Sequence, residues 1–193
     1  MEESNIIEVV KMLPISSDPK RAEFELNSMI YNIQHNHDIT VHEDLCGAID
    51  PYKFIFAFQE NKDGSGDPTS SYGVLVIETA ADYQETERRI NDALDSMRND
   101  SENVTSFISI ARASEFMYIV FYKIGGTASY PVVKIKTVVS DPNPAGHYIE
   151  KSFETWKEDE GLFPYDKFMI DKNHIMFLCD DIWKKIKTSS KCY

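Results

Sequence analysis

Four aromatic residues recur at every second position in one short segment, and this alternation constrains the fold more than any other feature. They are Tyr52, Phe54, Phe56 and Phe58. Side chains two residues apart point to the same face of a β-strand, so the spacing predicts a strand over 52–59 with one aromatic face. A second strand is expected over 72–78. The turn-rich segment between them contains glycine and proline, so the two strands are expected to form a β-hairpin with a long loop.

The rest of the chain alternates between helical and strand-like patterns. Asp18 is a suitable N-cap and Pro19 suits the first helical position, which predicts a helix ending near His35. Further helices are expected over 4–12, 79–98, 149–161 and 175–186. Further strands are expected over 39–49, 104–112, 115–124 and 131–139, and Gly125-Gly126 is expected to join the last two. The sequence shows no internal repeat.

These elements predict an α+β fold. We expect a mainly antiparallel sheet of about five strands, with helices at both ends and one helix between hairpins. The 193 residues fit a single domain, 1–193. The loop 140–146 is the candidate sub-boundary, because the charge balance changes there.

Charge is the strongest indication of function. The net charge is −12, and the first 122 residues carry 22 acidic and 9 basic side chains. An acidic surface attracts basic partners and repels nucleic acid and anionic membranes. We therefore expect a protein partner with a basic surface, no nucleic-acid binding and no membrane binding. The predicted contact surface is the acidic helix with the loop near residues 60–71, through Asp63, Asp67, Asp82, Glu85, Asp92 and Asp95.

The N-terminal residues and the cysteines indicate the compartment. The first residues include acidic groups where a secretory signal needs basic ones, and the longest apolar run, Phe116–Tyr122, is too short to cross a bilayer. Three widely spaced cysteines, Cys46, Cys179 and Cys192, form no Cys-x-x-Cys motif. A cytoplasmic location is expected.

One segment is rich in potential metal ligands. His35, His37 and His42 lie within eight residues of each other, and imidazole nitrogens are zinc or iron ligands. A metal-dependent hydrolase built on these three residues is one alternative function, and a polar connection with solvated histidines is the other interpretation. No cofactor is expected, since Gly125-Gly126 does not open a helix as a phosphate-binding loop does.

The sequence therefore favours recognition over catalysis. The leading hypothesis is an acidic binding protein, an inhibitor of the immunity or anti-defence type, that occludes a basic partner. The alternatives are the metal-dependent hydrolase and a non-catalytic subunit of a larger complex, in which semi-exposed aromatic strands are buried between chains.

Overall fold

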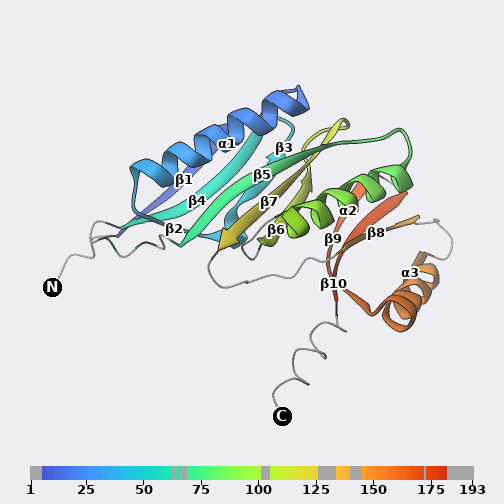
Figure 1. Cartoon of the computed structure of the whole chain (residues 1–193). Coiled ribbons are helices and arrows are strands. Elements are labelled where there is room, and N and C mark those ends of the chain that lie inside the picture. The colour runs from blue at the N-terminus through green and yellow to red at the C-terminus, as the bar shows by residue number, and fades with distance from the viewer. Residues whose placement is uncertain are drawn as a thin grey trace, which may run out of the picture. The chain divides into compact units, whose positions relative to one another are not determined.

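The computed structural model describes residues 6–61, 64, 66, 69–100, 105–125, 134–139, 145–171 and 173–181. Within these residues the protein combines helices with antiparallel sheets, which confirms the mixed fold class (Figure 1). The expected count of about five strands in one sheet does not match, because the described strands form three separate sheets. None of the described helices is both long enough and apolar enough to cross a membrane.

All three sheets are built from the same succession of elements, a βαββ unit that we call a repeat. The first repeat comprises β1 (Ile6–Pro14), α1 (Pro19–Asn36), β2 (Ile39–Val41), η1 (Glu43–Leu45), β3 (Gly47–Asp50) and β4 (Lys53–Asn61). The second comprises β5 (Ser70–Glu78), α2 (Tyr83–Asp100), β6 (Thr105–Arg112) and β7 (Met117–Gly125). The third comprises β8 (Lys134–Val139), α3 (Ala145–Thr155), η2 (Trp156–Glu160), β9 (Leu162–Asp171) and β10 (His174–Asp181). In each sheet the last strand of the repeat lies between the other strands and is antiparallel to them.

The first two repeats match in length as well as in order. β1 and β5 begin at 6 and 70, α1 and α2 at 19 and 83, and β4 and β7 at 53 and 117, so each pair is separated by 64 residues. The expectation of no internal repeat is therefore wrong. Few residues reveal it, since identical residues occupy only these equivalent positions: Val10 and Val74, Asp18 and Asp82, Glu23 and Glu87, Asn27 and Asn91, and Ile55 and Ile119.

The contacts between residues divide the chain into two compact units. Unit 1 comprises Met1–Ala80 and Met97–Tyr130, and unit 2 comprises Ala81–Ser96 and Pro131–Tyr193. Unit 1 therefore holds the first repeat and the strands of the second, whereas unit 2 holds most of α2 and the third repeat. That the chain folds as one domain stays a prediction. The expected sub-boundary, 140–146, lies mostly outside the described residues.

The aromatic face of β4 forms the core of unit 1. Phe54, Phe56 and Phe58 are all buried, as their two-residue spacing predicts. The Phe121 ring of β7 lies 5.6 Å from the Phe54 ring and 6.1 Å from the Phe56 ring, centroid to centroid. The first two sheets therefore share one core, and the apolar stripe of α1 joins it through Ala22, Leu26 and Ile30.

Unit 2 has a smaller aromatic core where α3 and η2 meet the third sheet. The Phe153 and Trp156 rings pack against Phe177 of β10, with centroids 4.9 and 5.9 Å apart. Gly161 ends the turn η2 with a φ of 66°, a left-handed conformation that glycine adopts without steric cost. This confirms the helical stripe and the glycine stop that the sequence predicts over 149–161.

The expected helix over 4–12 is wrong where the chain is described, because Ile6–Pro14 forms β1. The spacing of its apolar residues fits both a helix and a strand. In the structure Val9 and Leu13 face the core, and Val10 and Met12 lie on the opposite face. Isoleucine and valine favour strands, and pairing along all of β4 decides the outcome.

The expected helix over 175–186 is also wrong where the chain is described, because His174–Asp181 forms β10. This strand lies between β8 and β9, and four successive residues are buried on its two faces. They are Met176, Phe177, Leu178 and Cys179. A continuous apolar run is typical of a strand covered on both sides, and periodicity alone does not distinguish it from a buried helix. Residues 182–193 lie outside the described part.

The predicted hairpin between 52–59 and 72–78 does not form. β4 pairs with β1, β2 and β3, whereas β5 pairs with β7 in another sheet. The expected strand over 39–49 is interrupted by η1. Gly125-Gly126 does not join two paired strands, since β7 and β8 belong to different sheets.

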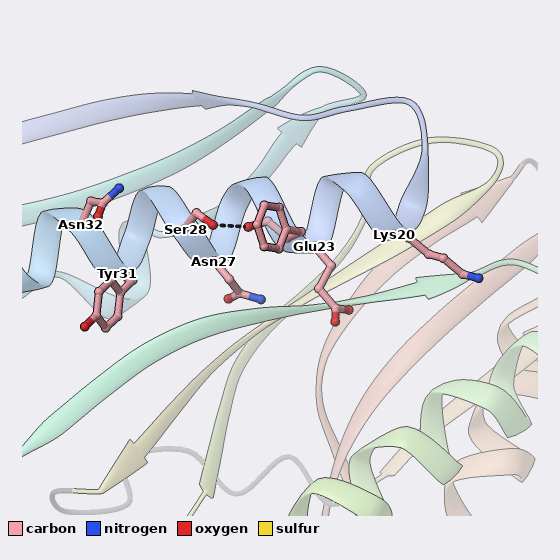
Figure 2. Close-up of a pocket in the computed structure, with 7 residues that line it drawn as sticks. Lys20, Glu23, Asn27, Ser28, Tyr31 and Asn32 are labelled. Atoms are coloured by element: carbon pink, nitrogen blue, oxygen red, sulfur yellow. Dashed lines mark hydrogen bonds between the residues drawn. The ribbon is translucent and has the colours of Figure 1, made fainter.

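Side chains of α1 bind the main chain of β5, which is an edge strand. Asn27 Nδ2 donates to the Val74 carbonyl at 2.8 Å, and Asn27 Oδ1 accepts from the Val74 N–H at 2.8 Å. Glu23 Oε2 accepts from the Val76 N–H at 2.7 Å. Both side chains extend from α1 toward β5 (Figure 2). The outward polar groups of this edge are therefore hydrogen-bonded inside the chain, which prevents pairing with another strand.

α2 binds the edge strand β8 in the same way. Asn91 accepts from the Ile135 N–H at 2.9 Å and donates to the Ile135 carbonyl at 3.1 Å. Glu87 Oε2 accepts from the Thr137 N–H at 2.7 Å. Each of these two helices thus uses a glutamate and an asparagine four residues apart to cover the first strand of the next repeat.

Candidate functional site

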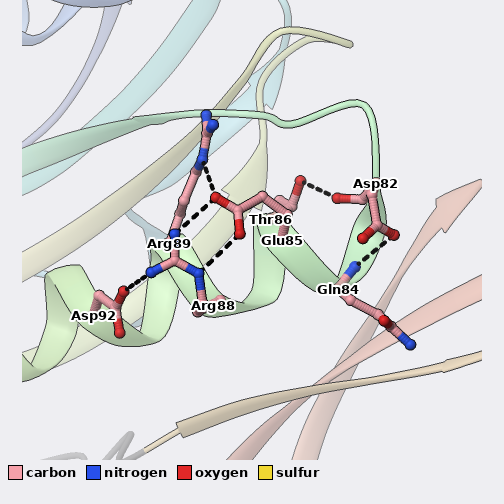
Figure 3. Close-up of polar contacts among 7 residues, drawn as sticks. All are labelled: Asp82, Gln84, Glu85, Thr86, Arg88, Arg89 and Asp92. Atoms are coloured by element: carbon pink, nitrogen blue, oxygen red, sulfur yellow. Dashed lines mark hydrogen bonds and ion pairs between the residues drawn. The ribbon is translucent and has the colours of Figure 1, made fainter.

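The acidic helix of the prediction, α2, carries its own neutralising cations. Arg88 lies between two carboxylates, with Nη2 2.8 Å from Glu85 Oε1 and Nη1 bonded to Asp92 (Figure 3). Arg89 Nε lies 3.0 Å from the same Glu85 oxygen. Hydrogen bonds from these two guanidinium groups lower the pKa of Glu85 to about 2. Glu85 and Asp92 therefore present less net charge than the sequence suggests.

The other predicted contact residues differ in their surroundings. Asp82 accepts from Gln84 N through its side chain and from Thr86 N through its carbonyl, so it caps the start of α2. Asp95 is exposed. Asp63 and Asp67 lie outside the described residues. Four of the six predicted residues thus lie on or beside α2, and a role of these residues in binding stays a prediction.

A second acidic surface lies on α3 and η2. Its members are exposed carboxylates, and none of them forms an ion pair within the described part of the chain. They are Glu150, Glu154, Glu158 and Asp159. The neighbouring Glu160 is bound by Lys136, with Oε2 2.6 Å from Nζ. We call the four unpaired carboxylates the α3 acidic row.

The three histidines of the candidate metal site are engaged separately. The His35 ring stacks on Tyr31 with centroids 4.3 Å apart. His37 Nδ1 lies 2.9 Å from Glu60 Oε1, and His42 Nε2 lies 2.6 Å from Glu8 Oε2. Among the described residues, no group of three or more histidine, cysteine, aspartate or glutamate side chains is arranged to hold a metal ion. The geometry gives the hydrolase alternative no support.

A cleft of about 610 Å³ opens beside His35 and His37 in unit 1. Its lining includes an ion pair between Lys123 and Glu43, whose Nζ and Oε1 atoms are 2.9 Å apart and whose side chains are 10% and 14% exposed. The Tyr72 hydroxyl donates to the same glutamate oxygen at 2.8 Å. The charges of this network offset each other, so we assign it a structural role.

The described cysteines are poor nucleophiles. Burial raises the pKa of Cys46 to about 11 and that of Cys179 to about 12. Both thiols are therefore protonated at neutral pH, and only a thiolate attacks a substrate readily. Cys46 instead bonds to the main chain of Ala57, whose N–H lies 3.3 Å from its sulfur.

Sequence reasoning missed two sets of residues. The first is the α3 acidic row, which was hidden because the C-terminal part of the chain is nearly neutral overall. The second is the Glu23 and Asn27 pair with its counterpart, Glu87 and Asn91. The available signal was the recurrence of Asp, Glu and Asn at equal spacing in two segments 64 residues apart. Comparison with protein-family models, with curated proteins and with solved structures returns no match.

Proposed function

We propose that this protein acts by binding another protein, as an inhibitor of the immunity or anti-defence type, and that its partner presents a basic surface. The observation that carries the proposal is the α3 acidic row. Its carboxylates are exposed and unpaired within the described residues, unlike those of Glu85 and Asp92 on α2. The contact surface is therefore assigned to α3 and η2.

The row is unfavourable for the helix that carries it. Glu150 and Glu154 lie four residues apart, and like charges at this spacing cost a helix about 0.2–0.5 kcal/mol per pair. α3 continues directly into η2, which ends at Gly161, so Glu158 and Asp159 lie in the last turn, where the helix dipole disfavours negative charge. A basic partner would remove both costs on binding. It would also associate faster, because complementary charge steers the encounter.

The test is capture of partners from the source cells with purified wild-type protein and two variants. The first variant neutralises three of the four carboxylates of the row through Glu150→Gln, Glu154→Gln and Glu158→Gln. The matched control neutralises three carboxylates of α2 through Glu85→Gln, Asp92→Asn and Asp95→Asn. We expect a basic partner that binds the wild type and the α2 variant, is lost from the row variant, and binds more weakly at high salt.

Two results would contradict the proposal. One is a partner that the row variant retains at wild-type affinity, measured by titration with the purified partner. The other is loss of binding in the α2 variant alone, which would return the contact surface to the helix that the sequence predicted.

A further inference from the structure

The first strands of the three repeats differ in what covers their outer edge. Side chains of α1 cover β5 and side chains of α2 cover β8. β1 is the equivalent strand of the first repeat, and it is also an edge strand. Within the described residues, no helix side chain binds its main chain. One position in a repeated arrangement therefore lacks its helix.

The outward groups of β1 follow from the register. Val10 pairs with Ala57 as Val74 pairs with Phe121, each 64 residues further along. The main chain of Ala57 is engaged away from β1, since its N–H meets Cys46 Sγ and its carbonyl accepts from His42 N at 3.0 Å. In such an antiparallel pair the N–H and C=O of Val10 also point away from their partner strand. Glu8 and Met12, two residues either side, have the same orientation.

The side chains beside this edge are apolar and exposed. Val10 is 63% exposed and Met12 is 65% exposed, whereas the equivalent Val74 is 1% exposed beneath the first repeat. Pro14 lies two residues after Met12 and has no N–H to donate. The outward-facing donors of β1 nearest to it are therefore the N–H groups of Glu8, Val10 and Met12. β1 thus offers an apolar strip with main-chain donors and acceptors alongside.

We propose that the edge of β1 binds an amphipathic helix of another protein, which carries Glu-x-x-x-Asn on the flank of its apolar stripe. The geometry of the two internal helices assigns the contacts. The glutamate would accept from the Met12 N–H, and the asparagine would bind both the N–H and the C=O of Val10. The apolar stripe, formed in α1 by Ala22, Leu26 and Ile30, would cover the exposed side chains of both residues. The inference rests on the proposed function in one respect, that the chain binds another protein. It concerns β1 and not the α3 acidic row.

A second copy of the chain does not supply this helix. α1 and α2 are occupied by β5 and β8, and α3 contains no asparagine. The helices that the structure describes therefore offer no free Glu-x-x-x-Asn. Pairing of two β1 edges in a dimer is the competing arrangement, and the experiment includes it.

The probe is a synthetic peptide with the sequence of residues 18–36, because this segment covers the equivalent edge of β5 inside the folded chain. Because isolated helices of this length are marginal in water, Arg21→Lys is introduced and linked to Glu25 as a lactam. These two side chains already touch, with Nε and Oε1 2.7 Å apart, and Arg21 is exposed. A control peptide carries Glu23→Ala and Asn27→Ala. Binding to the full chain is measured by fluorescence anisotropy, and the molar mass of the chain by light scattering.

Two variants of the protein complete the design. Val10→Pro removes the outward N–H without removing a bond to β4, and Val10→Thr keeps the N–H and the β-branched shape. We expect saturable binding to the wild type and to Val10→Thr, weakened about tenfold or more by Val10→Pro or by the control peptide. Amide chemical shifts of Val10 and Met12 are expected to move when the peptide binds the wild type, which needs no variant.

Three results would overturn the inference. They are no saturable binding to the wild type, equal binding of the two peptides, and a wild-type dimer that Val10→Pro converts to a monomer, which would assign the edge to a second copy. Any of these leaves the test of the α3 acidic row unaffected, so failure of one proposal is distinguishable from failure of the other.

Discussion

Lys123 is a cation buried beside Glu43, at 2.9 Å and with little exposure on either side. Removing one partner of such a pair leaves the other charge uncompensated away from water. We therefore predict that Lys123→Met lowers the free energy of unfolding by about 3 kcal/mol, measured by urea denaturation. Tyr72→Phe removes one hydrogen bond to the same carboxylate and is expected to cost about 1 kcal/mol. Equal losses in the two variants would contradict the buried-charge explanation.

Glu85 and Glu87 lie two residues apart on α2, but their pKa values are shifted in opposite directions. Arg88 and Arg89 lower the pKa of Glu85 to about 2, whereas burial raises the pKa of Glu87 above its usual value of 4.5. Carbon-detected NMR titration should show the Glu85 carboxylate ionising first and the Glu87 carboxylate last. Glu85→Gln and Glu87→Gln assign the two signals. Coincident titration of the two groups would contradict the contacts described for them.

The two shifts have opposite effects on stability. The stabilisation from Glu85 is present above its unfolded pKa of about 4.5 and is lost as the pH falls toward 2. For Glu87 the folded state holds the proton more tightly, so stability falls as the pH rises through and above 4.5. We expect Glu87→Gln to remove that second dependence. Urea unfolding of wild type and variant across this pH range measures it.

Single residues were predictable where their role is local. Asp18 caps α1 by accepting from Arg21 N at 2.8 Å, as the Asp-Pro sequence indicates. The ion pair between Glu43 and Lys123 was not predictable, because 80 residues separate its members and only the packing of two sheets brings them together. The charge of Glu85 was overestimated, although Arg88 and Arg89 lie three and four residues after it on the same helix, because a total net charge does not show which carboxylates are paired.

At the scale of elements, the helix-to-strand contacts predict that asparagines bound to a strand contribute more to the free energy of unfolding than an exposed asparagine does. Asn27→Ala leaves the N–H and C=O of Val74 without partners, which costs about 1–3 kcal/mol. Asn91→Ala is predicted to have the same effect through Ile135. The control is Asn32→Ala on the exposed side of α1, expected to change stability by about 0.5 kcal/mol or less. Thermal and urea unfolding give the comparison, and a similar loss in the control would contradict it.

Helices and strands were predictable where the spacing of apolar residues fits one of the two structures and excludes the other. The aromatic alternation of β4 fits only a strand, and the stripe of α1 fits only a helix. β1 and β10 were misassigned because their apolar residues fit both spacings, and the outcome depends on partners distant in the sequence. Pairing between sheets was not predictable either, since β4 and β5 are neighbours in the chain but belong to different sheets.

For the whole molecule, the repeated arrangement predicts that a substitution in one repeat destabilises the sheet it contacts and leaves distant sheets unchanged. In a chain of repeats, stability is approximately the sum of each unit and its contacts with neighbours. Asn91→Ala is therefore expected to raise amide hydrogen exchange in β8, β9 and β10 while exchange in β1 and β4 stays at the wild-type rate. Mass spectrometry of peptic fragments measures both regions in one experiment. A uniform increase along the chain would show a single cooperative unit and contradict the prediction.

The equal spacing of the first two repeats also has a consequence for protein engineering. α1 and α2 have 18 residues each, begin at equivalent positions and place Glu and Asn on the same two turns. They therefore resemble two copies of one module. They differ at inward sites, where alanine faces threonine and leucine and isoleucine exchange places, and at Gln34, which bonds the Tyr72 main chain and is matched by Arg98 in α2. Transplanting one helix into the position of the other therefore requires repacking these inward sites and replacing the Gln34 contact, and a designer can lengthen the array by reusing the same module.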